Sequence, residues 1–192
     1  MYRRPKVPGA RVFFSVALAQ RGGSLLVDEV VRLRAAVRMT QAERPFAIDA
    51  WVVLPDHLHA VWTLPPGDAD FSTRWGAIKS RFTRSLRDEC RVGFNPTVAQ
   101  RSGYGVGWNS TLRRSPSKLR KGDAGIWQRR FWEHHLRDEA DFWRHVRYCW
   151  LNPVKHGLVA APQDWLYSSV HRDARDRGGM DVLMPSDRRA GV

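Results

Sequence analysis

Two histidines separated by one residue are the first feature of this sequence that could do chemistry. His57 and His59 lie in an apolar, β-branched run that predicts a strand, and residues i and i+2 of a strand point to the same face. Two neutral imidazoles on one face are a suitable binding pair for a divalent cation. Because short His-x-His pairs also occur by chance, with hydrogen-bonded or exposed rings, the pair alone defines only a candidate metal site.

A tyrosine near the end of a predicted helix is the second such feature. Helical spacing over residues 138–151 places Tyr148 and Asn152 one turn apart on the polar side of the helix. A tyrosine hydroxyl, with a pKa of about 10, attacks poorly at neutral pH unless a metal ion polarises its phosphodiester target. Asn152 offers a carbonyl oxygen as a third ligand beside the two histidines. The pattern predicts metal-assisted attack by Tyr148; an ordinary surface tyrosine is the alternative.

The charge of the chain is concentrated in its middle. Lys and Arg number 32 against 19 Asp and Glu, a net charge of +13, and residues 74–130 hold 14 of the bases and 3 of the acids. A solvated surface is the ordinary explanation of a basic run, but this run has few acids to pair with, which favours contact with a polyanion. The candidate nucleic-acid-binding residues are Lys79, Arg81, Arg84, Arg113, Arg114, Lys118, Arg120, Lys121, Arg129, Arg130, Arg144 and Lys155.

Length and composition limit the class of protein. The 192 residues suit one domain, which we expect over residues 1–170, with a basic loop at 91–125 and a weakly ordered tail at 171–192. Two widely separated cysteines exclude a disulfide framework and indicate a reducing cytosol, so we expect a cytoplasmic protein. No run reaches the roughly 18–20 apolar residues of a membrane span. The apolar run at 12–19 after three basic residues resembles a secretory signal, but we interpret it as a buried strand.

The elements that must position the candidate residues follow from apolar periodicity. Alternating or continuous apolar runs predict strands at 11–19, 46–54, 57–64 and 126–136, and steps of three and four predict helices at 25–37, 71–86 and 138–151. Pro153 is expected to end the last helix and distort its final turn. The order β-α-β-β-α-β-α predicts an α+β fold, a ferredoxin-like split β-α-β antiparallel sheet with helices packed on one face.

Several blocks of the sequence resemble a known family. They are VLPDHLH at 53–59, Lys79, IWQRRFWEH at 126–134, YCWLNPVKHGLV at 148–159, and the DW and SS pairs at 164–169. In this order they resemble the IS200-like transposases, most closely the REP-associated tyrosine transposases, from the first strand to residue 169. The chain departs from that pattern at Asp56, where the family usually has asparagine. An extra carboxylate there would join the metal shell or hinder the approach of a phosphate.

The resemblance implies a fold, an activity and roles for the candidate residues. It implies the HUH endonuclease fold and a metal-dependent tyrosine (Y1) transposase that acts in DNA transposition and recombination. His57, His59 and Asn152 would hold Mg²⁺ or Mn²⁺, and Tyr148 would attack single-stranded DNA to leave a 5′-phosphotyrosine and a free 3′-OH. The implied partner is hairpin DNA, such as a REP-like palindrome, and the implied state is a monomer or a homodimer.

Four tryptophans are candidates for contact with nucleic-acid bases. Of the tryptophans, Trp75, Trp108, Trp127 and Trp132 could stack on bases, although Trp75 and Trp127 fit a buried position better.

A domesticated, non-catalytic hairpin DNA- or RNA-binding protein is the main alternative function. A hydrolytic nuclease that uses a metal-bound water is a weaker one, because it would normally need more carboxylates near His57.

Overall fold

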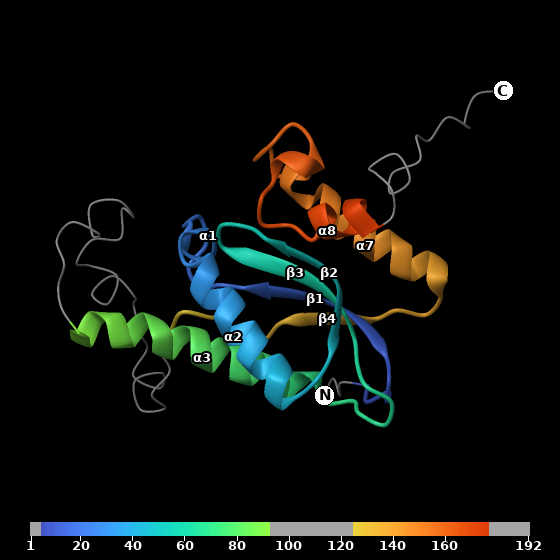
Figure 1. Ribbon diagram of the computed structural model, residues 1–192, viewed down its shortest axis with the longest axis horizontal. Coiled ribbons are helices and arrows are strands. Elements are labelled where there is room, and N and C mark those ends of the chain that lie inside the picture. The colour runs from blue at the N-terminus through green and yellow to red at the C-terminus, as the bar shows by residue number, and fades with distance from the viewer. Residues whose placement is uncertain (1–4, 93–124, 177–192) are drawn as a thin grey trace.

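The computed structural model describes residues 5–92 and 125–176, which form a four-stranded sheet covered by helices (Figure 1). Predictions that concern residues 93–124, including most of the basic loop, lie outside the described residues. The elements in chain order are β1 (Arg11–Ala17), α1 (Leu25–Asp28), α2 (Val30–Glu43), β2 (Ala47–Val53), β3 (His57–Thr63), α3 (Phe71–Val92), β4 (Trp132–His135), α7 (Glu139–Lys155), the 3₁₀ turn η1 (Pro162–Asp164) and α8 (Val170–Asp176).

The strands pair in the order β2-β3-β1-β4, and every pairing is antiparallel. β2 and β3 form a hairpin, as predicted from the short Pro55–Asp56 connection, while β1 lies between β3 and β4. This order is the one a split β-α-β unit produces, because each helical crossover joins two consecutive strands that are separated by one other strand in the sheet. The predicted α+β fold class is therefore confirmed.

Both faces of the sheet are covered by helices. Phe14, Leu58 and Trp62 belong to a core with α2 and α3, whereas Phe13 and Val61 belong to a second core with α7. Figure 1 shows α2 and α3 on one side of the sheet and α7 and α8 on the other. The expectation of helices on one face was too narrow, because the central strands are apolar on both sides and so need a cover on both.

Three predicted elements differ in detail from the observed ones. The first predicted helix is broken at Glu29 into α1 and α2, and α2 continues to Glu43. The fourth strand is shortened to four residues, with Trp127 joined to Leu18 only by an isolated bridge. The last helix does not end before Pro153: α7 runs to Lys155, because a proline in the last turn removes only one backbone hydrogen bond.

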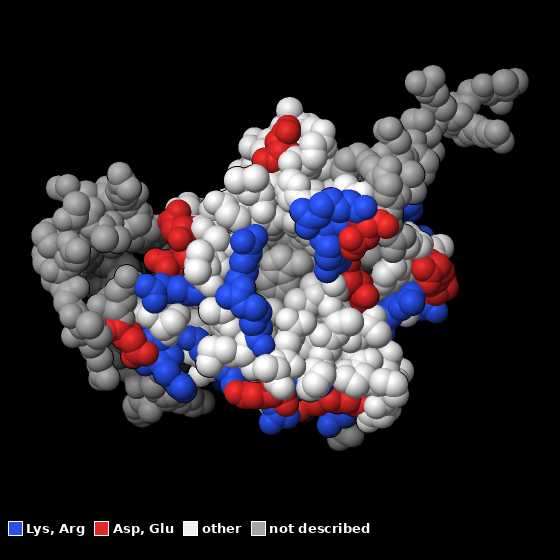
Figure 2. All heavy atoms as spheres, viewed as in Figure 1, with Lys and Arg blue, Asp and Glu red and all other residues white. Residues whose placement is uncertain are grey.

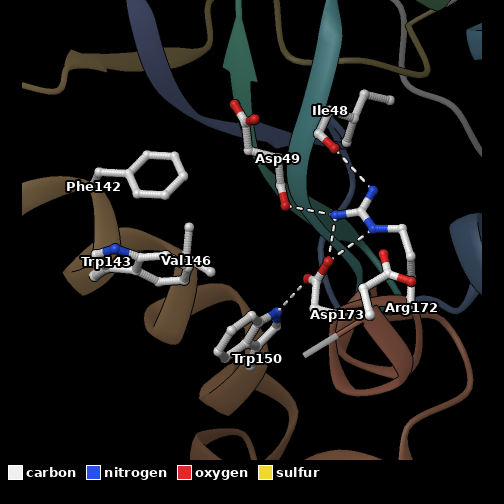
Figure 3. A pocket seen from close by; sticks show the side chains of 9 residues that line it. Ile48, Asp49, Phe142, Trp143, Val146, Trp150, Arg172 and Asp173 are labelled. Carbon is white, nitrogen blue, oxygen red and sulfur yellow. Dashed lines mark hydrogen bonds and ion pairs between the residues drawn. The ribbon is translucent and has the colours of Figure 1, made fainter. Parts of the chain in front are cut away.

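A small helix closes the second face near the end of the described chain. Arg172 of α8 donates to the backbone oxygens of Ile48 and Asp49 at 2.9 and 2.7 Å, and Trp150 of α7 donates to Asp173 at 3.1 Å. Figure 3 shows these contacts around a pocket of about 430 Å³ between β2, α7 and α8, which contains none of the predicted site residues. Residues 171–176, predicted as part of a weakly ordered tail, thus belong to an ordered helix. In the ranges that the structure describes, no helix is long and apolar enough to cross a bilayer.

Candidate active site

The two histidines of β3 lie on the face of the sheet that α7 covers. His57 and His59 alternate with Leu58 and Ala60, whose side chains enter the core beneath α2 and α3. Their ring centroids are 5.1 Å apart, and both residues are almost buried. The structure therefore confirms the geometric part of the prediction, that the two imidazoles project together from one strand.

Helix α7 brings the predicted nucleophile to this pair. The ring centroid of Tyr148 lies 5.1 Å from that of His59, and Phe13 of β1 packs against both rings at 5.7 and 5.5 Å. Tyr148 remains 37% exposed, so its ring is fixed from one side and open to a ligand from the other. Two features that are about 90 residues apart in the sequence thus meet at one place.

Asn152 lies one turn beyond Tyr148 on α7 and is buried. Among the described residues, neither its Oδ1 nor its Nδ2 finds a hydrogen-bond partner, and the same is true of the buried Nε2 of His59. An unpaired polar group in the interior costs about 1–3 kcal/mol, so unpaired atoms beside a candidate site are candidates to bind a ligand or an ion. A free imidazole nitrogen and a free amide oxygen are a donor set that fits a divalent cation.

Each histidine is held from behind through its Nδ1 atom. His57 Nδ1 shares a 2.7 Å hydrogen bond with Asp56 Oδ1, and His59 Nδ1 shares one of 2.6 Å with the hydroxyl of Ser15. Asp56 in turn accepts from the Gly22 amide at 2.7 Å and from Arg21 Nε at 3.0 Å. A second partner on one ring nitrogen directs the other toward a metal ion. Asp56 therefore holds His57 through Nδ1, so the ring's Nε2 is the nitrogen left for the candidate metal site.

Burial keeps both imidazoles neutral. Burial, the largest cause, and the nearby His57 and His156 together lower the pKa of His59 to about 3. Burial also lowers the pKa of His57, although the hydrogen bond to Asp56 opposes this effect. The pKa of Asp56 is raised by burial but is lowered overall by its bonds from Gly22 and His57 and by the charge of Arg21. At neutral pH the histidines can act as ligands and Asp56 is ionised.

Sequence reasoning missed two residues of this site. Ser15 was treated only as part of a strand, and its contact with His59 depends on the pairing of β1 with β3. His156, at the C-cap of α7, lies with its ring centroid 5.2 Å from that of His57. Its spacing of four residues from Asn152, one helical turn, was the available indication.

A separate group of potential metal ligands lies at the start of α7. The ligand atoms of His134, Asp141 and His145 are within 4.8 Å of one another, and Asp141 accepts from His134 Nε2 at 2.9 Å. Asp141 also accepts from the backbone and side chain of Arg137 at 3.3 and 3.2 Å. Since the buried carboxylate already has these partners, we interpret the group as the connection that fixes α7 to β4.

The connection gives a test of stability. Asp141→Asn should lower the free energy of unfolding by about 2–3 kcal/mol, because it removes charged hydrogen bonds to a buried group. The hydrogen bond from His134 is the main reason that the pKa of Asp141 is lowered from its ordinary 3.8. The stabilisation should therefore be complete well above pH 3.8 and be lost progressively as the pH falls from there toward the lower pKa of the folded protein. Thermal and urea unfolding from pH 7 to pH 3 would measure both effects.

The matched control is Glu139→Gln. Glu139 pairs with Arg11 at 2.7 Å, but both side chains are exposed, so this change should cost well under 1 kcal/mol. An equal loss of stability in the two variants would contradict the assigned role of Asp141.

The predicted nucleic-acid-binding residues fall into three groups. Lys79 and Arg81 of α3 have protein partners: Lys79 donates to the Gln128 oxygen at 2.9 Å, and Arg81 pairs with Glu43 at 2.5 Å. Other candidates are exposed, and Lys155 lies 5.5 Å from the centroid of the Tyr148 ring. The exposed candidates are Arg84, Arg129, Arg130, Arg144 and Lys155. Those outside the described residues are Arg113, Arg114, Lys118, Arg120 and Lys121.

The predicted basic surface is not continuous on the face that Figure 2 shows. Lys and Arg side chains gather over the α2 and α3 side and again near α8; other residues separate the two groups, and Asp and Glu side chains lie beside each. Arg74 is buried and bonded to Asp68 at 2.6 Å, so its charge supports the fold. Much of the net positive charge of the middle segment belongs to residues outside the described ranges.

Known proteins resemble this chain over most of its length. A REP-associated tyrosine transposase of Escherichia coli K12 is 40% identical over 172 residues, which cover 90% of this chain and 83% of that protein. A relative from Haemophilus influenzae, which carries the same family name provisionally, is 39% identical over 174 residues, 91% of this chain and 87% of its own. No protein-family model matches the chain.

A solved structure gives the same result for the fold. The REP-associated tyrosine transposase bound to a REP hairpin superposes with a TM-score of 0.73 at 37% identity, covering all of this chain and 94% of that one. In this chain a histidine pair on an interior strand of the sheet faces a tyrosine on the covering helix. The chain belongs to the family of REP-associated tyrosine transposases.

Proposed function

We propose that this protein is a single-strand DNA endonuclease and strand transferase that acts beside a DNA hairpin through a 5′-phosphotyrosine link at Tyr148. The observation that carries the proposal is the contact of the Tyr148 ring with His59, 5.1 Å between centroids, at the rim of a buried histidine pair. The solved family member is bound to a REP hairpin, which supports hairpin DNA as the substrate.

His57, His59 and Asn152 are the residues that would hold Mg²⁺ or Mn²⁺. The unpaired Nε2 of His59 and amide of Asn152 fit this role, and the lowered histidine pKa values keep the ligands unprotonated. When bound, the ion supplies Lewis-acid polarisation of the scissile phosphate.

The chain's own residues account for the covalent step. The Tyr148 oxygen attacks phosphorus, the bond from phosphorus to the 3′ oxygen breaks, and a tyrosyl ester to the 5′ phosphate forms. The tyrosine proton leaves to solvent, and the departing 3′ oxygen takes up a proton to become a free hydroxyl. Phe13 fixes one side of the Tyr148 ring, which orients the nucleophile. Because one phosphate ester replaces another, a 3′-OH can reverse the step without ATP.

Hairpin oligonucleotides labelled on either side of the cut test this proposal. The protein with Mg²⁺ should form an SDS-resistant adduct that retains the label on the 5′-phosphate side and releases the other. Salt-sensitive binding that is indifferent to EDTA, without any adduct or cleavage, would instead identify a non-catalytic hairpin DNA- or RNA-binding protein.

Asp56 gives a second test, of the metal site itself. Asp56→Ala should weaken Mn²⁺ binding, measured by calorimetry without DNA, by about 10- to 100-fold, because His57 loses the partner that orients it. Asp56→Asn retains an oxygen that can accept from His57 Nδ1 and should bind within a few-fold of the native protein. If Asp56→Ala binds Mn²⁺ as tightly as the native protein, Asp56 does not support the metal site.

A further inference from the structure

An exposed tryptophan lies on the edge strand beside the site. Trp132 begins β4 and is 56% exposed, whereas Trp75 and Trp127 are buried in the core. Trp108 lies outside the described residues. An exposed indole on the rim of a site is a suitable surface for a flat ligand, because one side chain offers a large apolar face.

Strand register places this indole in line with the histidine site. Ser15 of β1 pairs with His59 on one side and with Trp132 on the other, so the three side chains form one row across three strands. Paired residues of adjacent strands project to the same face, which here is the face of Tyr148. Two strand spacings separate Trp132 from His59, about 10 Å at backbone level. That separation is similar to the reach of one nucleotide from its phosphate to its base.

The indole is also held in one orientation. Its plane is within 5° of the His134 ring at 5.9 Å, and Phe13 meets it edge-on at 5.7 Å. His134 is itself fixed by Asp141 at 2.9 Å and by a stacked His145 at 4.9 Å. One face of the indole is thus covered by a fixed histidine. Since the residue is more than half exposed, the rest of the ring remains open to a partner.

Exposed basic residues occur close to this row in the chain or in space. Arg129 and Arg130 precede β4 and are exposed, and Lys155 lies over the Tyr148 ring. Aromatic platforms with flanking cations are typical of surfaces that bind single strands, where bases stack and cations follow the backbone. We propose that Trp132 is the stacking platform for a base of the single-stranded DNA adjacent to the scissile phosphate. The proposal rests on the proposed function, since it assumes that the phosphate lies at His57, His59 and Tyr148.

Fluorescence of 2-aminopurine tests this platform without requiring cleavage. In the Tyr148→Phe protein with Mg²⁺, the analogue is placed at successive positions of the single strand flanking a hairpin. Quenching should be greatest at one or two neighbouring positions. Trp132→Ala should remove it there and weaken binding by about 5- to 150-fold, and Trp132→Tyr should retain most of both. Leu151→Ala, which truncates another exposed apolar side chain, is the matched control.

Several other outcomes would overturn the assignment of Trp132 as a platform for DNA. If Trp132→Ala leaves the quenching unchanged, or lowers it equally at every position of the strand, Trp132 is not the stacking platform. Equal quenching of an RNA flank overturns its assignment to DNA, and a changed oligomeric state without a change in quenching assigns the indole to a second copy of the chain. Position-specific stacking by a protein that never cleaves would leave this proposal standing and overturn the proposed chemistry. Cleavage without position-specific stacking would overturn this proposal and leave the proposed chemistry standing.

Discussion

Tyr148→Phe should abolish the covalent adduct with hairpin DNA and lower cleavage by at least ~10³-fold. The change removes one oxygen and retains the ring that packs against Phe13 and His59, so folding and DNA binding should be unaffected. Adduct formation on denaturing gels measures the first effect, and binding to the same hairpin in a gel-shift assay measures the second.

Tyr167→Phe is the matched control for this change. Tyr167 also contacts other rings, at 5.4 Å from Trp165, but it packs against the core beneath α2 and α3 and not against the histidine pair. It should form the adduct at the native rate. Normal cleavage by Tyr148→Phe would show that Tyr148 is not the nucleophile and would favour hydrolysis by water.

His59→Ala should lower cleavage by about 10²-fold or more at saturating DNA. His59 is the more enclosed of the two histidines, and its lowered pKa keeps its imidazole neutral near neutral pH, as a metal ligand must be. Loss of Lewis-acid polarisation removes several kcal/mol of stabilisation of the transition state. Titration of Mn²⁺ against the initial cleavage rate is the measurement.

The control for this variant is His171→Ala. His171 donates to the backbone oxygen of Trp165 at 2.9 Å and lies in α8, away from β3, so its loss should leave the Mn²⁺ dependence unchanged. EDTA should stop cleavage by the native protein, and added Mn²⁺ should restore it. Full cleavage activity of His59→Ala in EDTA would show that the mechanism does not require a metal ion.

The sequence predicted the sheet better than it predicted the helices around it. The strand runs at β1, β2 and β3 stand out because their β-branched and aromatic residues are bounded by Pro and Gly. The predicted end of α7 was wrong. Local propensity disfavours a helical Asn152 before Pro153, but the burial of both residues keeps the last turn helical. Which helices pack on the second face of the sheet depends on which strands pair. The apolar periodicity along the chain does not show how the strands pair.

The site was predictable only where its residues are close in sequence or carry a recognised pattern. His57 with His59, and Tyr148 with Asn152, follow from a spacing of two in a strand and of four in a helix. The support of His59 by Ser15, and the row from His59 to Trp132, depend on the register of β1 with two neighbours. The direction of Asp56 depends on the Gly22 turn that binds it, so the sequence left its role open.

The central claim is that Tyr148 forms the bond to DNA, and mass spectrometry of the isolated adduct tests it most directly. After digestion by a protease and a nuclease, tandem spectra should locate a nucleotide, attached through its 5′ phosphate, on the peptide that contains Tyr148. Attachment at any other residue, or cleaved DNA with no nucleotide on the protein at any time point, would contradict the account.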